Sequence, residues 1–100
     1  MIHLMVLYPK GEGKTFDAEY WANTHMPLAG DESWPTCTKW EATKGDDNSP
    51  FFAAGHFYFA SQDDLGAAMG SEATAKVMAD VANYTNIEPQ VSIYEVMTSS

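Results

Sequence analysis

Two long apolar runs stand out along this chain, and each predicts a buried strand. Residues 2–8 are almost entirely apolar and are closed by Pro9 and the glycines after it, which are residues that favour turns. Residues 51–60 carry apolar side chains on both faces, with Phe52 on one face and Phe57 on the other. Because both runs are apolar on two faces, we expect them to be the central strands of a sheet that is covered on both sides.

Two other segments alternate between polar and apolar residues, as strands with one solvent-exposed face do. In residues 36–43, Trp40 faces one way while Cys37 and Lys39 face the other, which predicts an edge strand protected by charge. Residues 89–97 show a similar alternation and predict a last strand. The sequence thus predicts four strands in all.

The segment between the first two strands has the pattern of an amphipathic helix. Phe16 and Tyr20 fall on one face at four-residue spacing, and Thr15 is placed to cap the N-terminus. Pro27 cannot continue the hydrogen-bond ladder, so we expect the helix to end near His25. A titratable imidazole is thereby predicted at a defined helix end.

A second helical region follows the second apolar run. Ser61 and Asp64 form a start that resembles a capping box. Gly66 and Gly70 suggest a break, because glycine is unfavourable inside a helix, and a further helical piece is expected at about 71–82. One helical region is therefore predicted between the first and second strands, and another between the third and fourth.

The predicted element order is β-α-β-β-α-β in a single domain that spans residues 1–100. This is the ferredoxin-like, split βαβ arrangement, an α+β fold with a four-stranded antiparallel sheet and helices on one side. The sheet face without helices would then expose apolar side chains of both central strands. We expect a second copy of the chain to cover that face, which predicts a homodimer.

The charge balance narrows the possible partners. Five lysines and no arginine stand against fourteen acidic residues, which gives a formal charge of -9. A phosphate backbone or an anionic membrane would be repelled, so neither nucleic acid nor a membrane surface is an expected partner. Without arginine the usual bidentate clamp for carboxylates is missing, which favours a neutral or apolar substrate.

Cysteine usage and the N-terminal residues indicate a compartment. Cys37 is the only cysteine, so no intramolecular disulfide can form, and a reducing environment is expected. The chain begins without a basic leader, and no apolar run approaches the length of a membrane helix. We therefore expect a soluble cytoplasmic protein.

The sequence contains partial matches to cofactor and metal motifs, but none has the residue spacing that the motif requires. The run Gly13-Lys14-Thr15 resembles the end of a phosphate-binding loop, but the first glycine of that motif would fall at Tyr8. The three histidines of the chain lack the paired spacing of metal ligands. We therefore expect neither a cofactor nor a metal.

His25 is the leading candidate for chemistry. Histidine has an unperturbed pKa close to neutrality, so an imidazole held at a helix end beside aromatic residues can carry protons. The same position suits a structural role, because a histidine there can donate to free carbonyls and complement the helix dipole. His56 lies in a buried strand, where hydrogen-bonded core histidines are common. Tyr8, Tyr20 and Trp40 either line a pocket or build the core.

Three motifs give the chain a resemblance to the EthD family, which is named for a protein encoded with a bacterial ether-degradation system. The motifs occur in the family's order: Phe16-Asp17-x-x-Tyr20-Trp21-x-x-x-His25-Met26-Pro27-Leu28, then Gly55-His56-Phe57-Tyr58-Phe59, then Val77-Met78-Ala79-Asp80-Val81-x-Asn83-Tyr84-Thr85. The similarity runs from the first strand to the last. It implies a dimeric α+β barrel, in which two ferredoxin-like sheets pack face to face.

The resemblance also says where chemistry would take place. The wider barrel superfamily includes cofactor-free monooxygenases acting on aromatic polyketides, a muconolactone isomerase and haem-degrading enzymes, and their pockets lie largely between sheet and helices. His25 and His56 match the family's motif positions and are the catalytic candidates. Tyr8, Tyr20 and Trp40 are the substrate-binding candidates. The helical histidine that ligates haem in the haem-degrading relatives has no counterpart in the second helical region, which contains no histidine between Ser61 and Ala82.

Two functions are compatible with these observations. The first is a small cofactor-independent enzyme, either a monooxygenase-like oxidoreductase or an isomerase, with His25 as general acid or base. Its substrate would be a modest apolar metabolite of aromatic, polyketide or lactone type, in ether or aromatic degradation. The second is a non-catalytic dimeric binding or accessory protein for such a metabolite. Composition and spacing do not separate the two.

Overall fold

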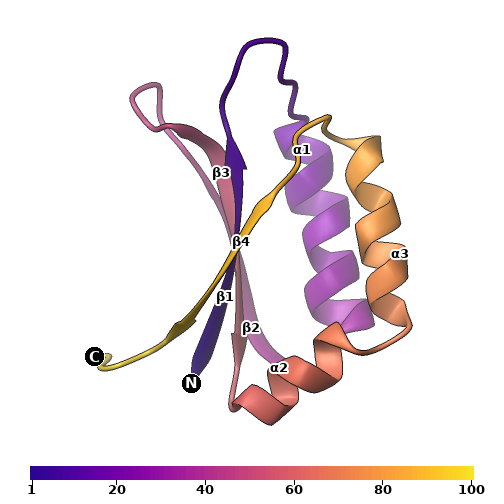
Figure 1. Ribbon diagram of the computed structural model, residues 1–100, viewed down its shortest axis with the longest axis vertical. Helices are drawn as coiled ribbons and strands as arrows, with labels where there is room; N and C mark the ends of the chain where they lie inside the picture. Colours follow the sequence, from indigo (N-terminus) through magenta and orange to yellow (C-terminus); the bar gives the residue numbers. More distant parts are fainter.

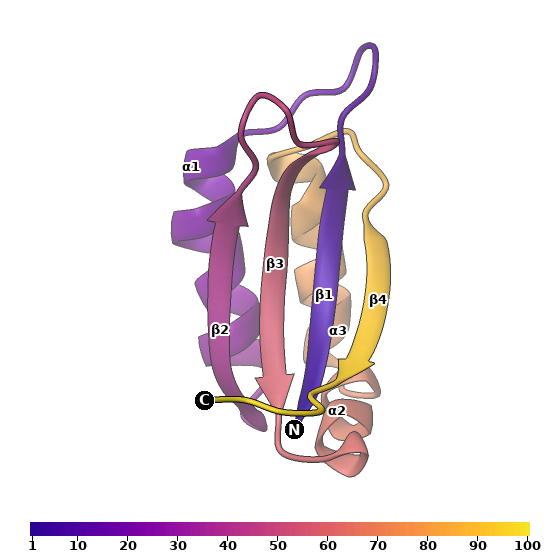
Figure 2. The ribbon, with the colours of Figure 1, turned by 90° about the vertical axis from the view of Figure 1, so that its left-hand side faces the viewer.

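The computed structural model describes residues 1–100 and contains one four-stranded antiparallel sheet (Figure 2). Its strands are β1 (Ile2–Pro9), β2 (Cys37–Lys44), β3 (Phe51–Phe59) and β4 (Gln90–Glu95). Their order across the sheet is β2-β3-β1-β4, so the two strands that are apolar on both faces are central, as the sequence predicts. The split βαβ topology is thereby confirmed.

All helices cover one face of this sheet (Figure 1). They are α1 (Ala18–Tyr20), η1 (Trp21–His25), η2 (Leu28–Ser33), α2 (Gln62–Met69), α3 (Ala73–Asp80) and η3 (Val81–Asn83). The first three form one continuous helical rod that lies beside α3 over the sheet (Figure 1). The predicted break in the second helical region occurs at Gly70, which ends α2. None of the helices has the length and apolar character needed to cross a membrane.

The first helical rod is longer than the sequence predicts, because Pro27 does not end it. Pro27 adopts helical angles, with φ -64° and ψ -35°, and the rod continues to Ser33. The turns on either side are π-type, as shown by the Met26 N–H, which donates to the Trp21 carbonyl five residues back. A π turn holds an extra residue, and this wider turn accommodates a proline that lacks an N–H.

Two local details of the prediction were wrong. The N-cap of the first rod is Asp17, whose carboxylate accepts from the Tyr20 N–H at 3.2 Å, and not Thr15. Cys37 does not share a face with Lys39, because the pairing of β2 with β3 shifts between these two residues. This bulge turns Cys37 toward the helices, where it packs against the core, while Lys39 stays exposed.

The core lies between the sheet and the helices. Its largest fully buried side chains are Trp21, Tyr8, Phe59 and Met26. The opposite face of the sheet, seen in front in Figure 2, carries no helix. We call the side chains of β1 and β3 that point there the open face: His3, Met5, Leu7, Ala54, His56 and Tyr58, all of them half-buried.

Candidate functional site

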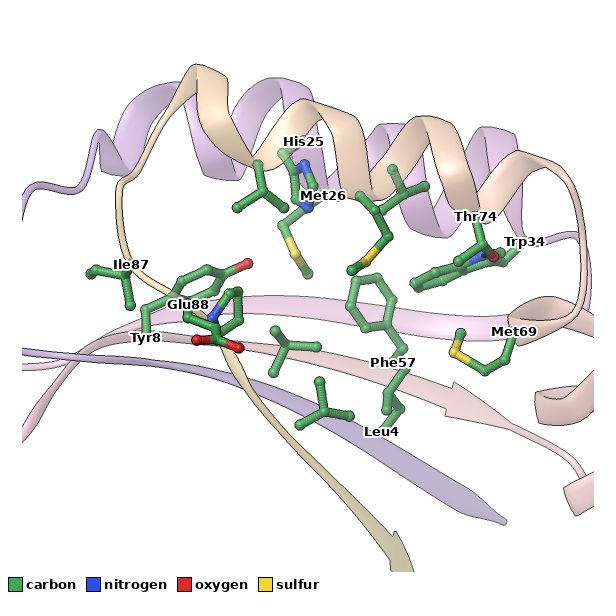
Figure 3. Close-up of a pocket in the computed structure, with 16 residues that line it drawn as sticks. Leu4, Tyr8, His25, Met26, Trp34, Phe57, Met69, Thr74, Ile87 and Glu88 are labelled. Atoms are coloured by element: carbon green, nitrogen blue, oxygen red, sulfur yellow. Dashed lines mark hydrogen bonds between the residues drawn. The ribbon is translucent and has the colours of Figure 1, made fainter.

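A cavity of about 430 Å³ lies between the sheet and the helices (Figure 3). Sixteen residues line it, of which twelve are hydrophobic. Met78 on α3 and Val91 on β4 both line the cavity and are 67% and 61% exposed, so the cavity opens between these two elements. A mostly apolar, concave space with few polar groups is typical of small-molecule sites.

His25, the last residue of η1, places its imidazole in the wall of this cavity (Figure 3). Its side chain is only 6% exposed. Nδ1 lies 2.9 Å from Oδ2 of Asp80, the last residue of α3, which lies beside the first helical rod. The other ring nitrogen, Nε2, makes no hydrogen bond within the chain.

The Asp80 carboxylate is itself held by several donors. The Tyr20 hydroxyl donates to Oδ1 at 2.7 Å, and the Asn83 amide donates to the same oxygen at 2.8 Å. Burial opposes ionisation of this carboxyl, but the hydrogen bonds from Asn83, Tyr20 and His25 outweigh it and lower the pKa of Asp80. Asp80 is therefore an ionised acceptor that orients His25.

The protonation state of His25 follows from two opposing effects. Burial disfavours the charged imidazolium and lowers the pKa of His25, although the hydrogen bond and charge of Asp80 act in the opposite direction. His25 is thus neutral at pH 7. Because Asp80 can only accept, the proton of the neutral ring is on Nδ1, and Nε2 presents a lone pair. A neutral, oriented imidazole of this kind is a competent general base.

The lowered pKa of His25 makes a prediction about stability. A group whose pKa is lower in the folded than in the unfolded chain contributes stability that is lost as pH falls below the unfolded value, about 6.5 for histidine. His3 and His56, whose pKa values burial also lowers, act in the same direction. We expect the free energy of unfolding, measured with denaturant, to be smaller at pH 5 than at pH 7.5. The His25→Gln variant should show a smaller decrease, and an equal or larger decrease in that variant would contradict the burial of a neutral His25.

Tyr8 is a second polar group in the cavity wall, and it is paired with Tyr84 behind it. The Tyr8 and Tyr84 hydroxyl oxygens are 2.7 Å apart and buried. The Tyr84 ring packs against the His25 imidazole, with ring centroids 4.6 Å apart. Burial raises the pKa of Tyr8 and of Tyr84, so both remain protonated at neutral pH.

The structure separates the five site residues expected from the sequence. His25 and Tyr8 line the cavity, whereas Tyr20, Trp40 and His56 do not. Tyr20 contacts the site indirectly, through Asp80. Trp40, on the edge strand β2, packs over Gly30, and its indole N–H donates to Asp31.

His56 lies on the open face, on the side of the sheet away from His25. Its Nδ1 is 2.9 Å from Nε2 of His3, and its Nε2 is 2.9 Å from the Thr43 hydroxyl. The His3 ring also stacks on Tyr58, with centroids 4.5 Å apart. The two predicted catalytic candidates, His25 and His56, therefore do not share one site, because strand alternation puts the His56 side chain on the opposite face of the sheet.

Two residues of the site were missed from the sequence alone. Asp80 and Tyr84 lie more than fifty residues after His25, so no local spacing connects them to it. Both do occur in the third motif of the family resemblance, which was the available signal. Nowhere do three or more His, Cys, Asp or Glu side chains gather so that they could hold a metal ion.

Comparison with known proteins gives a consistent assignment. The family model described as the EthD domain matches residues 10–88. The crystal structure of an EthD-like protein from Ralstonia eutropha JMP134 is 32% identical, covers 99% of this chain and 94% of its own, and superimposes with a TM-score of 0.88. An ethyl tert-butyl ether d (EthD) family protein from Bacillus halodurans C-125 is 24% identical, with coverage of 97% and 99% and a TM-score of 0.75.

A more distant structure supports the fold alone. It is a dimeric protein of unknown function with a ferredoxin-like fold from Bacteroides fragilis NCTC 9343. It is 12% identical, covers 95% of both chains and has a TM-score of 0.66. None of the curated proteins matches this chain.

Proposed function

The chain belongs to the EthD family, and from that premise and the geometry of the cavity we propose that it is a small enzyme that moves a proton on a modest apolar substrate. His25 is the acid or base. In the forward direction Nε2 takes a proton from the bound substrate, and the resulting imidazolium is stabilised by the Asp80 carboxylate. The same imidazolium can return the proton to a different substrate atom.

The observation that carries this proposal is the His25–Asp80 pair in the wall of an apolar cavity. A histidine that only capped its helix would not need a buried carboxylate partner from another helix. The Asp80 side chain is 11% exposed and receives three hydrogen bonds. Removing a carboxylate from water in this way is unfavourable, and a single capping contact would not require it. The pair matches the base-and-orienter arrangement of general acid–base catalysis.

The lining of the cavity supports a neutral, largely apolar substrate. No lysine lines it, and the chain has no arginine. Its only carboxylate is Glu88, which is exposed and would repel an anion. Trp34, Phe57 and the methionines offer flat and adaptable apolar surface. We propose an aromatic or lactone-like molecule, for which proton removal is a step that an isomerase and a cofactor-free oxygenase would share.

Exchange of acidic protons tests this proposal. 2-Tetralone is a bicyclic aromatic ketone whose protons beside the carbonyl exchange slowly with solvent. We expect the protein to accelerate their replacement by deuterium in D₂O, followed by ¹H NMR, beyond an equal concentration of free imidazole. A protein that binds 2-tetralone without accelerating exchange would instead be the binding or accessory protein of the alternative hypothesis.

We also propose that two chains pack through their open faces to form a homodimer. Both central strands present half-buried side chains there, and a distant structure with the same fold is described as dimeric. A second copy would remove Met5, Leu7 and Tyr58 from water, which stabilises the pair by the hydrophobic effect. The two sheets would then enclose a barrel.

A charge on the open face should separate the dimer. Met5 is half-buried in one chain, so Met5→Glu can fold as a monomer but would bring unpaired carboxylates into a symmetric interface. We expect sedimentation at micromolar concentration to show a dimer for the wild type and a monomer for Met5→Glu. Ala75→Glu, which adds the same charge on the exposed side of α3, is the matched control and should remain dimeric. A monomeric wild type would contradict the packing.

A further inference from the structure

Tyr8 and Tyr84 form a hydrogen-bonded hydroxyl pair whose direction can be worked out. Tyr84 is 4% exposed, and its hydroxyl has one partner in the chain, the Tyr8 oxygen at 2.7 Å. Tyr8 is also buried, at 2% exposed, but it lines the cavity and Tyr84 does not, so only the Tyr8 proton can find a second acceptor, on a ligand in the cavity. With such a ligand bound, both buried hydroxyls have an acceptor only if Tyr84 donates to Tyr8. The Tyr8 oxygen is then the acceptor, and its own proton remains free.

The electrostatics of the pair agree with this direction. Burial raises the pKa of both tyrosines, but the contact between them acts oppositely on the two groups. It lowers the pKa of Tyr8, as expected of the acceptor, and raises the pKa of Tyr84, as expected of the donor.

The free proton of Tyr8 is available at the same end of the cavity as His25. Tyr8 reaches this end from β1, and Figure 3 shows its hydroxyl and the His25 ring on one side, with Trp34 and Met69 on the other. A ligand here would meet a hydrogen-bond donor at Tyr8 and a lone pair at His25. Apolar side chains would surround the rest of it.

We propose that the Tyr8 hydroxyl donates to the oxygen of a carbonyl substrate while His25 removes a proton from the carbon next to that carbonyl. The C–H bond breaks, its proton goes to Nε2, and its electron pair forms a carbon–carbon double bond as the carbonyl becomes an enolate. The enolate oxygen accepts from Tyr8, and return of the proton to carbon or oxygen completes the cycle without an oxidant or reductant. The substrate class is thus a cyclic, largely apolar ketone or lactone with an acidic adjacent C–H.

This inference rests on the proposed proton transfer at His25, but it adds a separate binding requirement. Tyr84 is a positioning residue, because it does not line the cavity and acts by holding the Tyr8 oxygen. The affinity that a ligand gains from its oxygen atom should therefore depend on Tyr8, and to a smaller extent on Tyr84.

Two flat ligands that differ only in an oxygen atom measure this gain in affinity. 2-Naphthol has the shape of the enol of 2-tetralone and carries an oxygen, whereas naphthalene has the same ring system without it. We expect wild-type protein to bind 2-naphthol more tightly, as followed by ligand fluorescence. In Tyr8→Phe, 2-naphthol binding should weaken about tenfold while naphthalene binding is unchanged. The rate of 2-tetralone exchange should fall about 10²–10³-fold.

The controls separate a donor from a structural tyrosine. Tyr84→Phe should reduce the preference for 2-naphthol less than Tyr8→Phe does, and Tyr94→Phe, on the exposed edge strand, should not change it. If Tyr8→Phe keeps the wild-type preference, or if wild-type protein binds both ligands equally, the donor role is overturned. If the preference depends on Tyr8 but wild-type protein never accelerates exchange, the proposed proton transfer fails while the donor role stands.

Discussion

Replacing His25 by glutamine is expected to slow the exchange of 2-tetralone protons by about 10²–10⁴-fold while the protein stays folded. The glutamine amide can donate to Asp80 where Nδ1 does now, and its size is close to that of histidine. It has no basic lone pair to replace Nε2, so binding survives and proton transfer does not. Exchange is measured by ¹H NMR, and folding by denaturant titration at pH 7.5.

The matched control is His56→Gln, the same substitution on the other side of the sheet. His56 bonds to His3 and Thr43 and does not line the cavity, so its loss should leave the exchange rate close to that of the wild type. Equal losses of rate in the two variants would mean that His25 has no special role. Full activity in His25→Gln would exclude it as the base.

Asp80→Asn is expected to have an effect of similar size, about 10²–10⁴-fold on exchange, for a different reason. The asparagine oxygen would keep the hydrogen bonds from Tyr20 and Asn83, which leaves its amide N–H directed at His25. Nδ1 must then accept rather than donate, so the imidazole proton moves to Nε2. The lone pair that faces the substrate is thereby lost, although the ring remains in place.

A double variant and a spectrum distinguish this explanation from simple misfolding. Because His25 and Asp80 act as a unit, the double variant His25→Gln/Asp80→Asn should be no slower than either single variant. The ¹⁵N chemical shifts of the His25 ring should show the proton on Nδ1 in the wild type and on Nε2 in Asp80→Asn. Losses that multiply in the double variant, or an unchanged tautomer in Asp80→Asn, would contradict the orienting role.

The fold could be predicted from sequence because its signals are regular. The runs that form β1 and β3 are apolar on both faces, and this pattern alone placed them at the centre of the sheet. The errors came from local irregularities that a fixed period cannot anticipate. A bulge after Cys37 reversed the face of one side chain, and widened turns let the first rod pass Pro27.

The candidate site was less predictable, because it is assembled from distant parts of the chain. His25 stood out by residue type and helix position, and Tyr8 was one of three aromatic residues expected either to line a pocket or to build the core. The carboxylate that orients His25 comes from α3, and nothing in local spacing connects Asp80 to it. His56 was grouped with His25 because both match motif positions of the family, but strand alternation placed it on the open face.

The most direct test of the proposed mechanism is a ¹H–¹⁵N NMR titration of the histidine rings with 2-naphthol at pH 7.5. If the ligand occupies the cavity against the base, the Nε2 signal of His25 should shift as 2-naphthol is added. The proton on Nδ1 should remain, because Asp80 continues to accept it. An Nε2 signal that does not move, or ligand-induced shifts confined to His3 and His56, would contradict a proton-transfer site at His25.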